Sequence, residues 1–104
     1  MESVFYLSKA VTKTIEQVIQ DENVHYNHMI LPNGNALPVH KTNSNVYMTV
    51  VKGTLTISLE RGEYRRHPAG TVLRLPFGVE MHAKNDEEEI LELIVIKAPA
   101  PVNK

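Results

Sequence analysis

The stretch GNALPVHKTNSNVYMTVVKG, residues 34–53, carries most of the information about the fold. It places a β-branched and aromatic segment, VYMTVV, between two glycines, which is typical of a strand bounded by turns. A second stretch with similar punctuation, GTVLRLPFGVEMHAKN at residues 70–85, follows after one hairpin. Short strands separated by glycine and proline turns at intervals of roughly ten residues predict an all-β sandwich or barrel.

The rest of the chain also has the pattern of strands. We expect strands at residues 24–31, 46–51, 55–59, 63–67, 71–75 and 90–96, where apolar residues alternate or run on between turn signals. Residues 1–23 are ambiguous, because apolar residues at helical spacing have β-branched neighbours, and a peripheral strand or a short helix fits equally. The sequence predicts one domain: an N-terminal edge segment (1–23), a barrel (24–97) and a surface tail (98–104).

Composition excludes several classes of partner and site. The chain has 104 residues, a formal net charge of −1 and no cysteine. A charge near zero gives no general attraction to nucleic acid or to an anionic membrane, and the lack of thiols excludes disulfides and thiolate metal sites. The sequence shows no signal-peptide pattern and no apolar run of the roughly 20 residues that span a bilayer, so we expect a cytoplasmic protein.

The turn residues of the two stretches keep a recognisable spacing. The matching residues are Gly34, His40, Gly53, Gly70, Pro76, Gly78 and Asn85. This pattern resembles the two motifs of the cupin family, specifically the small single-domain cupins. The resemblance implies a small jelly-roll barrel made of two packed antiparallel sheets.

The same resemblance indicates where metal-binding cupins hold their ion. In those proteins two histidines, a glutamate and a third histidine converge inside the barrel, and His40 matches the first histidine. The other three positions carry Thr42, Val46 and Met81. Stable sites need about three or four good donors, and one imidazole with a hydroxyl falls short of that. The sequence therefore favours no metal centre and no other cofactor.

An atypical metal site is the alternative. His82 follows Met81 and faces inward only if a bulge reverses the alternation of side chains, and His28 lies on the strand before the first motif. Together with His40, these histidines would hold a divalent ion such as Zn, Fe, Mn or Ni. The resemblance then implies an enzyme of the isomerase or dioxygenase type.

The barrel interior is the concave site that the sequence predicts. Its expected lining is apolar with a few polar groups: His28, His40, Thr42, Val46, Met48, Met81 and Glu92. Such a lining suits a small organic ligand, so the first hypothesis is a binding or sensing module without metal. A third hypothesis is a barrel that is packed shut. Glu92 interrupts an apolar strand and needs a charged partner, inside the barrel or at a subunit contact, unless its face borders solvent.

The expected partners are a small molecule and a second copy of the chain. Small cupins are similar in pairing as homodimers that trade an edge strand near the N-terminus, and residues 1–20 are β-branched and amphipathic enough to do so. Neither nucleic acid nor a membrane is expected as a partner. Arg65 and Arg66 form only a short basic pair on an edge, and His67 is expected in a solvated loop.

Overall fold

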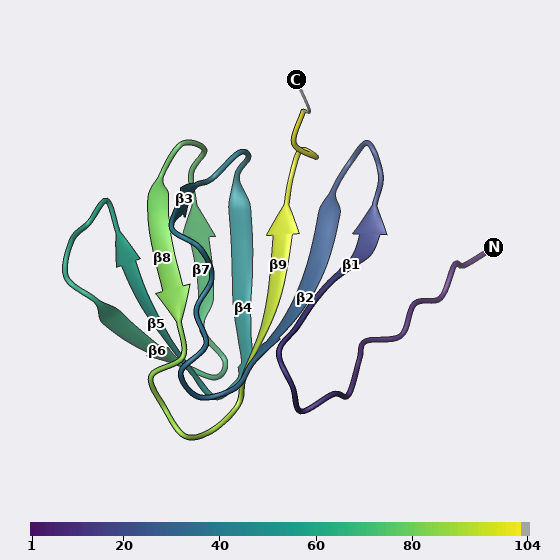
Figure 1. The fold of residues 1–104 in the computed structure, drawn as a ribbon. Helices are drawn as coiled ribbons and strands as arrows, with labels where there is room; N and C mark the ends of the chain where they lie inside the picture. Colours follow the sequence, from purple (N-terminus) through teal and green to yellow (C-terminus); the bar gives the residue numbers. More distant parts are fainter. Residues whose placement is uncertain (103–104) are drawn as a thin grey trace.

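The computed structural model describes residues 1–102 and folds them into β-strands joined by turns (Figure 1). The strands, in chain order, are β1 (Thr14–Gln20), β2 (His25–Leu31), β3 (His40–Lys41), β4 (Val46–Lys52), β5 (Thr54–Leu59), β6 (Arg65–Pro68), β7 (Val72–Leu75), β8 (Glu80–Lys84) and β9 (Leu91–Lys97). The predicted all-β class is confirmed. In the described part of the chain, no helix is long and apolar enough to cross a membrane.

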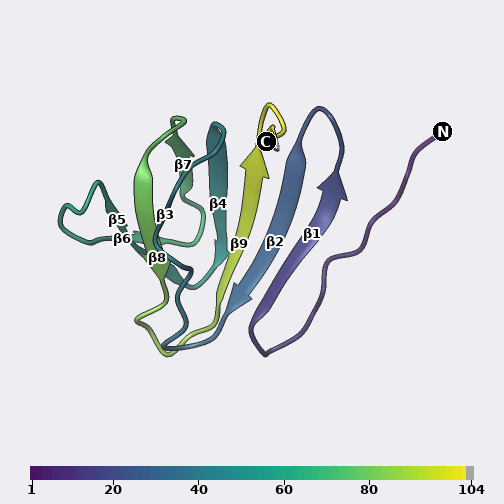
Figure 2. The ribbon, with the colours of Figure 1, turned by 45° about the horizontal axis from the view of Figure 1, so that its top comes forward.

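The strands form two antiparallel sheets. One has five strands in the order β1-β2-β9-β4-β7, and the other has four in the order β3-β8-β5-β6. Strands far apart in the sequence are therefore neighbours: β2 pairs with β9, and β9 also pairs with β4. This arrangement is the predicted jelly roll, and Figures 1 and 2 show the two sheets packed against each other.

The core lies between the two sheets and follows from the alternation of side chains along each strand. In β4, Val46, Met48 and Val50 are buried, whereas Tyr47 and Val51 on the other face are exposed. Similar inward-facing residues from other strands complete the core: Leu31, Leu55, Ile57, Leu75, Met81, Ala83, Leu91, Leu93 and Val95. These contacts hold the two sheets together.

The sheets do not close on each other along the side formed by β6 and β7. These strands are edge strands of different sheets, and no ladder joins them, although only residues 69–71 separate them in the chain. The barrel is consequently open along this side, where side chains of both strands reach inward.

The N-terminal segment ends in a strand, which settles the ambiguity left by the sequence. β1 forms the outer edge of the five-stranded sheet through its pairing with β2. Residues 1–13 precede it without regular structure, and the first residues of the chain extend away from the sheets in both views (Figures 1 and 2). At the other end, residues 98–102 follow β9 as a tail, and residues 103–104 of the predicted surface tail lie outside the described residues.

Candidate functional site

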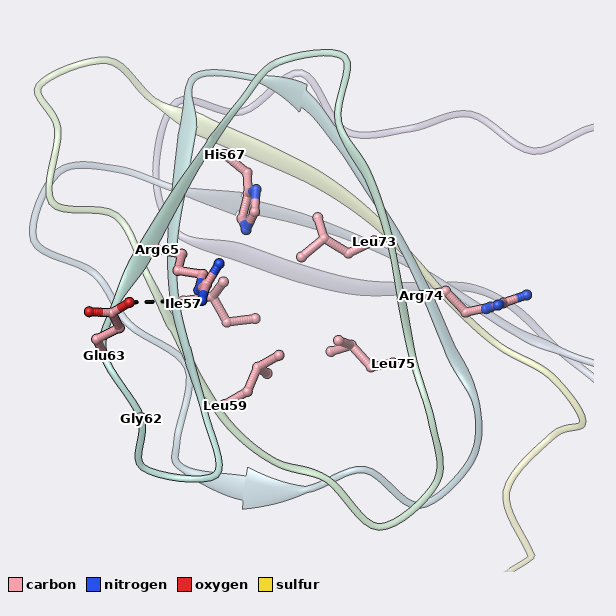
Figure 3. A pocket seen from close by; sticks show the side chains of 9 residues that line it. All are labelled: Ile57, Leu59, Gly62, Glu63, Arg65, His67, Leu73, Arg74 and Leu75. Carbon is pink, nitrogen blue, oxygen red and sulfur yellow. Dashed lines mark ion pairs between the residues drawn. The ribbon is translucent and has the colours of Figure 1, made fainter.

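A pocket of about 560 Å³ occupies the open side of the barrel (Figure 3). Its apolar walls come from one strand of each sheet: Ile57 and Leu59 on β5, and Leu73 and Leu75 on β7. Ile57 and Leu75 also belong to the core, so the pocket is continuous with the packed interior. Walls made by strands of two packed sheets form a preformed concave site rather than a loop depression.

Charged and polar groups border the same pocket. Arg65 and His67 come from β6, Glu63 from the turn before it, and Arg74 from β7. Figure 3 shows the side chains of Arg65 and His67 directed toward the space between the strands, whereas Arg74 points away from it. Glu63 lies 3.8 Å from Arg65, and both side chains are largely exposed. Two cationic or basic side chains thus face an otherwise apolar space.

A second polar cluster lies on the outer face of the five-stranded sheet. His28 is fully buried on β2, with Nδ1 2.6 Å from Oε2 of Glu16 on β1 and Nε2 2.6 Å from Oε2 of Glu92 on β9. The registers of the two ladders place the three residues side by side, because Glu16 pairs with His28, and Glu92 pairs with neighbouring Ile30. Of the two environments that the sequence left open for Glu92, the structure has features of both: its side chain is 25% exposed, and it is paired with a histidine.

The geometry of this cluster fixes its protonation. A carboxylate oxygen only accepts hydrogen bonds, so two contacts of this length require a proton on both ring nitrogens of His28. Burial lowers the pKa of His28, but hydrogen bonds to Glu16 and Glu92 and the charge of both carboxylates outweigh it, and the pKa is raised above its ordinary value of 6.5. The pKa of Glu16 is lowered by a hydrogen bond from the Ser8 backbone N–H and by its bond to His28.

The N-terminal segment is connected to this cluster. The Ser8 N–H donates to the same Glu16 oxygen that accepts from His28, over 2.8 Å. Residues 8–11 also lie against Ile30, Ile90 and Glu92, with which they enclose a small depression. The cluster therefore joins three strands and the segment that precedes them.

Comparison with known proteins assigns the chain to a family. No family model matches the chain. It is 39% identical over 92 residues to the uncharacterized protein MJ0764 of Methanocaldococcus jannaschii, a match that covers 88% of this chain and 79% of the relative. The crystal structure of mj0764, described as an RmlC-like cupin family protein with a double-stranded β-helix fold, has a TM-score of 0.94 and 37% identity, covering 97% of this chain and 94% of that one. The chain belongs to the RmlC-like cupin family.

More distant structures share the cupin fold alone. TT1209 from Thermus thermophilus has a TM-score of 0.76 at 22% identity, over 86% of this chain and 85% of its own. A cupin superfamily protein from Desulfitobacterium hafniense also has a TM-score of 0.76, at 10% identity, over 89% of this chain and 83% of its own. The resemblance to small cupins that the sequence motifs indicated is confirmed.

In this cupin, three of the positions that carry metal ligands in metal-binding members hold side chains that pack in the core or form internal hydrogen bonds. Val46 and Met81 are 2% and 4% exposed and pack in the core. The Thr42 hydroxyl donates to the Pro76 carbonyl and accepts from the Val79 N–H, so its proton and one of its lone pairs are already used. An isopropyl group, a thioether and a committed hydroxyl do not fit a metal ion.

His40 and His82 lie apart from His28. His40 is exposed on β3, where its Nδ1–H donates to the Pro38 carbonyl over 2.8 Å. His82 is on β8, on the face opposite to buried Met81, and is hydrogen-bonded to the Tyr64 hydroxyl at 2.5 Å. The three histidines considered for an atypical metal site do not meet. Among residues 1–102, no group of three or more histidine, aspartate or glutamate side chains could hold a metal ion.

The pocket in this cupin is lined by residues other than the seven expected from the sequence. Val46, Met48 and Met81 are inside the barrel but in its packed core, and Thr42 is buried beside a turn. His28 and Glu92 face outward, on the opposite side of their strands from the core. None of the seven expected residues borders the pocket at β5, β6 and β7.

The residues that do border the pocket differ from the sequence-based expectation. The placement of His67 in a solvated loop is wrong: it is half-buried in β6 and lines the pocket. The alternation of Arg65 and His67 with Arg66 and Pro68 was the available signal, but a polar edge strand has the same pattern whether or not one face borders a pocket.

Proposed function

We propose that this cupin binds a small organic molecule in the pocket between β5, β6 and β7, without a metal ion at the position used by metal-binding cupins. The pocket itself is the observation that carries the proposal. Its volume of about 560 Å³ is in the range of known ligand sites, and its walls combine aliphatic side chains with a few polar groups. These are the features by which proteins bury the apolar part of a ligand and orient its polar part.

Two alternatives have less support. A barrel that is packed shut describes the region around Val46 and Met81, but not the open side at β6 and β7. An isomerase or dioxygenase with an atypical metal site would need His28, His40 and His82 together, and they lie on different parts of the molecule. Binding, with or without turnover of the ligand, is therefore the function we propose.

A fragment screen by ligand-observed NMR tests this function. The unmodified protein should bind a subset of small apolar fragments, and Leu73→Trp, which fills the pocket, should abolish their binding. Val72→Trp is the matched control, because Val72 is the neighbouring β7 residue, lies outside the pocket and is exposed. The proposal fails if no fragment binds, or if the fragments bind Leu73→Trp as well as they bind the control.

We also propose a second copy of the chain as the protein partner. Residues 4–7, VFYL, are four consecutive apolar residues with exposed side chains on a segment that extends from the sheets (Figure 2). A run of this kind is costly in water and gains stability when another surface covers it. Val11 and Ile15 continue the apolar surface toward β1. A cytoplasmic location stays a prediction from the sequence.

A further inference from the structure

We infer that the ligand of the β5–β6–β7 pocket is a small amphipathic anion, a carboxylate with a short apolar body. This inference rests on the proposed function and names the chemical class of its ligand. It follows from the division of the pocket into a cationic side on β6 and an aliphatic side on β5 and β7 (Figure 3).

The cationic side is available to a ligand. Among residues 1–102, Glu63 is the only ion-pair partner of Arg65, and the distance of 3.8 Å between Nη2 and Oε1 is too long for a hydrogen bond. The guanidinium therefore keeps donors that can bind both oxygens of a carboxylate. His67, two residues further along the same face of β6, is a second donor group, with a ring N–H that can donate to an anion.

The aliphatic side suits the body of such a ligand. Leu73 and Leu75 contribute branched side chains from β7 of the opposite sheet, and Leu59 contributes one from β5, the strand paired with β6. A ligand with its carboxylate at Arg65 and its chain toward Leu73 would remove apolar surface of both molecules from water while leaving its charge near the solvent-exposed rim. A cationic ligand would place its charge beside Arg65, and like charges at this distance are unfavourable.

The chain provides a matched control for the charge. Arg66 is next to Arg65 on β6 but does not border the pocket, and its guanidinium lies 3.0 Å from Glu87. Arg65→Gln and Arg66→Gln remove the same charge from adjacent positions of one strand. Only the first change removes it from the pocket.

Binding of hexanoate, hexanol and hexylamine to the full chain tests the inference, measured by isothermal titration calorimetry and ligand-observed NMR. Hexanoate should bind about fivefold more tightly than hexanol, which is the order expected for one partly exposed charged hydrogen-bonding group, and hexylamine should bind least. Arg65→Gln should lower hexanoate affinity to that of hexanol and leave hexanol unchanged. Arg66→Gln should alter neither. Added salt should weaken hexanoate binding alone.

The possible results separate this inference from the proposed function. Equal affinities for hexanoate and hexanol, both lost in Leu73→Trp, would overturn the inference that the ligand is an anion and support the proposal that ligands bind in the pocket. Tighter binding of hexylamine than of hexanoate would also overturn the inference that the ligand is an anion. Loss of hexanoate preference in Arg66→Gln as much as in Arg65→Gln would show a general charge effect and overturn the role of Arg65. Thermal unfolding curves of both variants check that each is folded.

Discussion

Gly53, between β4 and β5, is fixed by its surroundings as well as by its backbone angles. Its φ is +79°, and a Cβ at this position would lie 2.4 Å from the backbone carbonyl oxygen of Ile90. Gly70 has a similar φ of +92°, but a Cβ there would meet nothing within 4 Å. The two glycines therefore share the conformational requirement and differ in the space available.

Gly53→Ala should consequently destabilise the protein much more than Gly70→Ala. A left-handed conformation costs an alanine about 1 kcal/mol, and that is the loss of unfolding free energy expected for Gly70→Ala. The backbone clash at Gly53 should raise the loss to about 3 kcal/mol or more. Urea unfolding of both variants measures the difference. Equal losses of unfolding free energy in the two variants would mean that the backbone of the β8–β9 connection moves away from the added Cβ at no energetic cost.

The cluster of Glu16, His28 and Glu92 holds together β1, β2 and β9. His28 is fully buried and charged, and each carboxylate comes from a different neighbouring strand. Removing one member of a buried ion pair leaves an uncompensated charge. Here the two carboxylates are partly exposed, so water relieves part of that cost.

His28→Gln should lower the unfolding free energy by about 2 to 3 kcal/mol at pH 6, since it removes two charge-assisted hydrogen bonds. His25→Gln on the same strand is the control and should cost much less, because within residues 1–102 His25 has no such pair of carboxylate partners. Chemical unfolding at one pH compares the two. A loss in His28→Gln no larger than in His25→Gln would contradict the structural role of the cluster.

The stability of the unmodified protein should fall as the pH rises above 6.5. The pKa of His28 is raised in the folded state, so the folded protein keeps a proton that the unfolded chain has lost. The contribution of His28 is full below pH 6.5 and is lost as the pH rises through the folded pKa, by up to about 1.4 kcal/mol per pH unit. Unfolding free energies measured between pH 6 and 9 should show this slope, and it should be absent in His28→Gln. The same slope in both proteins would contradict the assignment of this pH dependence to His28.

Strand patterns predicted which residues share a face better than they predicted which face is inside. The alternation of side chains along a strand puts His28 and Ile30 on one face of β2, and Glu92 and Ile94 on one face of β9, and the structure agrees. Both faces of these strands carry apolar residues, however, so hydrophobicity alone could not distinguish the core side from the outer side. That is why His28 and Glu92 were expected in the barrel.

The overall fold was predictable because its signals are local and repeated. Glycines and prolines at Gly34, Gly53, Pro76 and Gly78 bound the strands, and their spacing, with matching residues such as His40, carried the resemblance to cupins. The ligand pocket was not predictable in the same way. It depends on two edge strands of different sheets, β6 and β7, standing apart across the open side, and no short-range pattern in the sequence reports such a gap.

The N-terminal segment should make the whole molecule a homodimer. Replacing Phe5 and Tyr6 together by serine removes the two aromatic side chains of the exposed VFYL run, and this should weaken the dimer or convert it to monomer. Replacing Phe77 by serine is the control, since Phe77 is also exposed but lies on a distant turn. Light scattering coupled to size-exclusion chromatography at micromolar concentration measures both. An unmodified protein that is monomeric, or a dimer unaffected by the double change, would contradict this partner.

The location of the ligand in this cupin can be observed directly by methyl NMR. Spectra of protein labelled at isoleucine, leucine, valine and methionine methyl groups would be recorded with increasing hexanoate and, separately, hexanol. We expect the signals of Ile57, Leu73 and Leu75 to shift with ligand concentration, and those of Val46, Met48 and Met81 to stay in place. Shifts confined to Val46, Met48 and Met81 would place the ligand at the position of the family's metal ion and contradict the pocket at β5, β6 and β7.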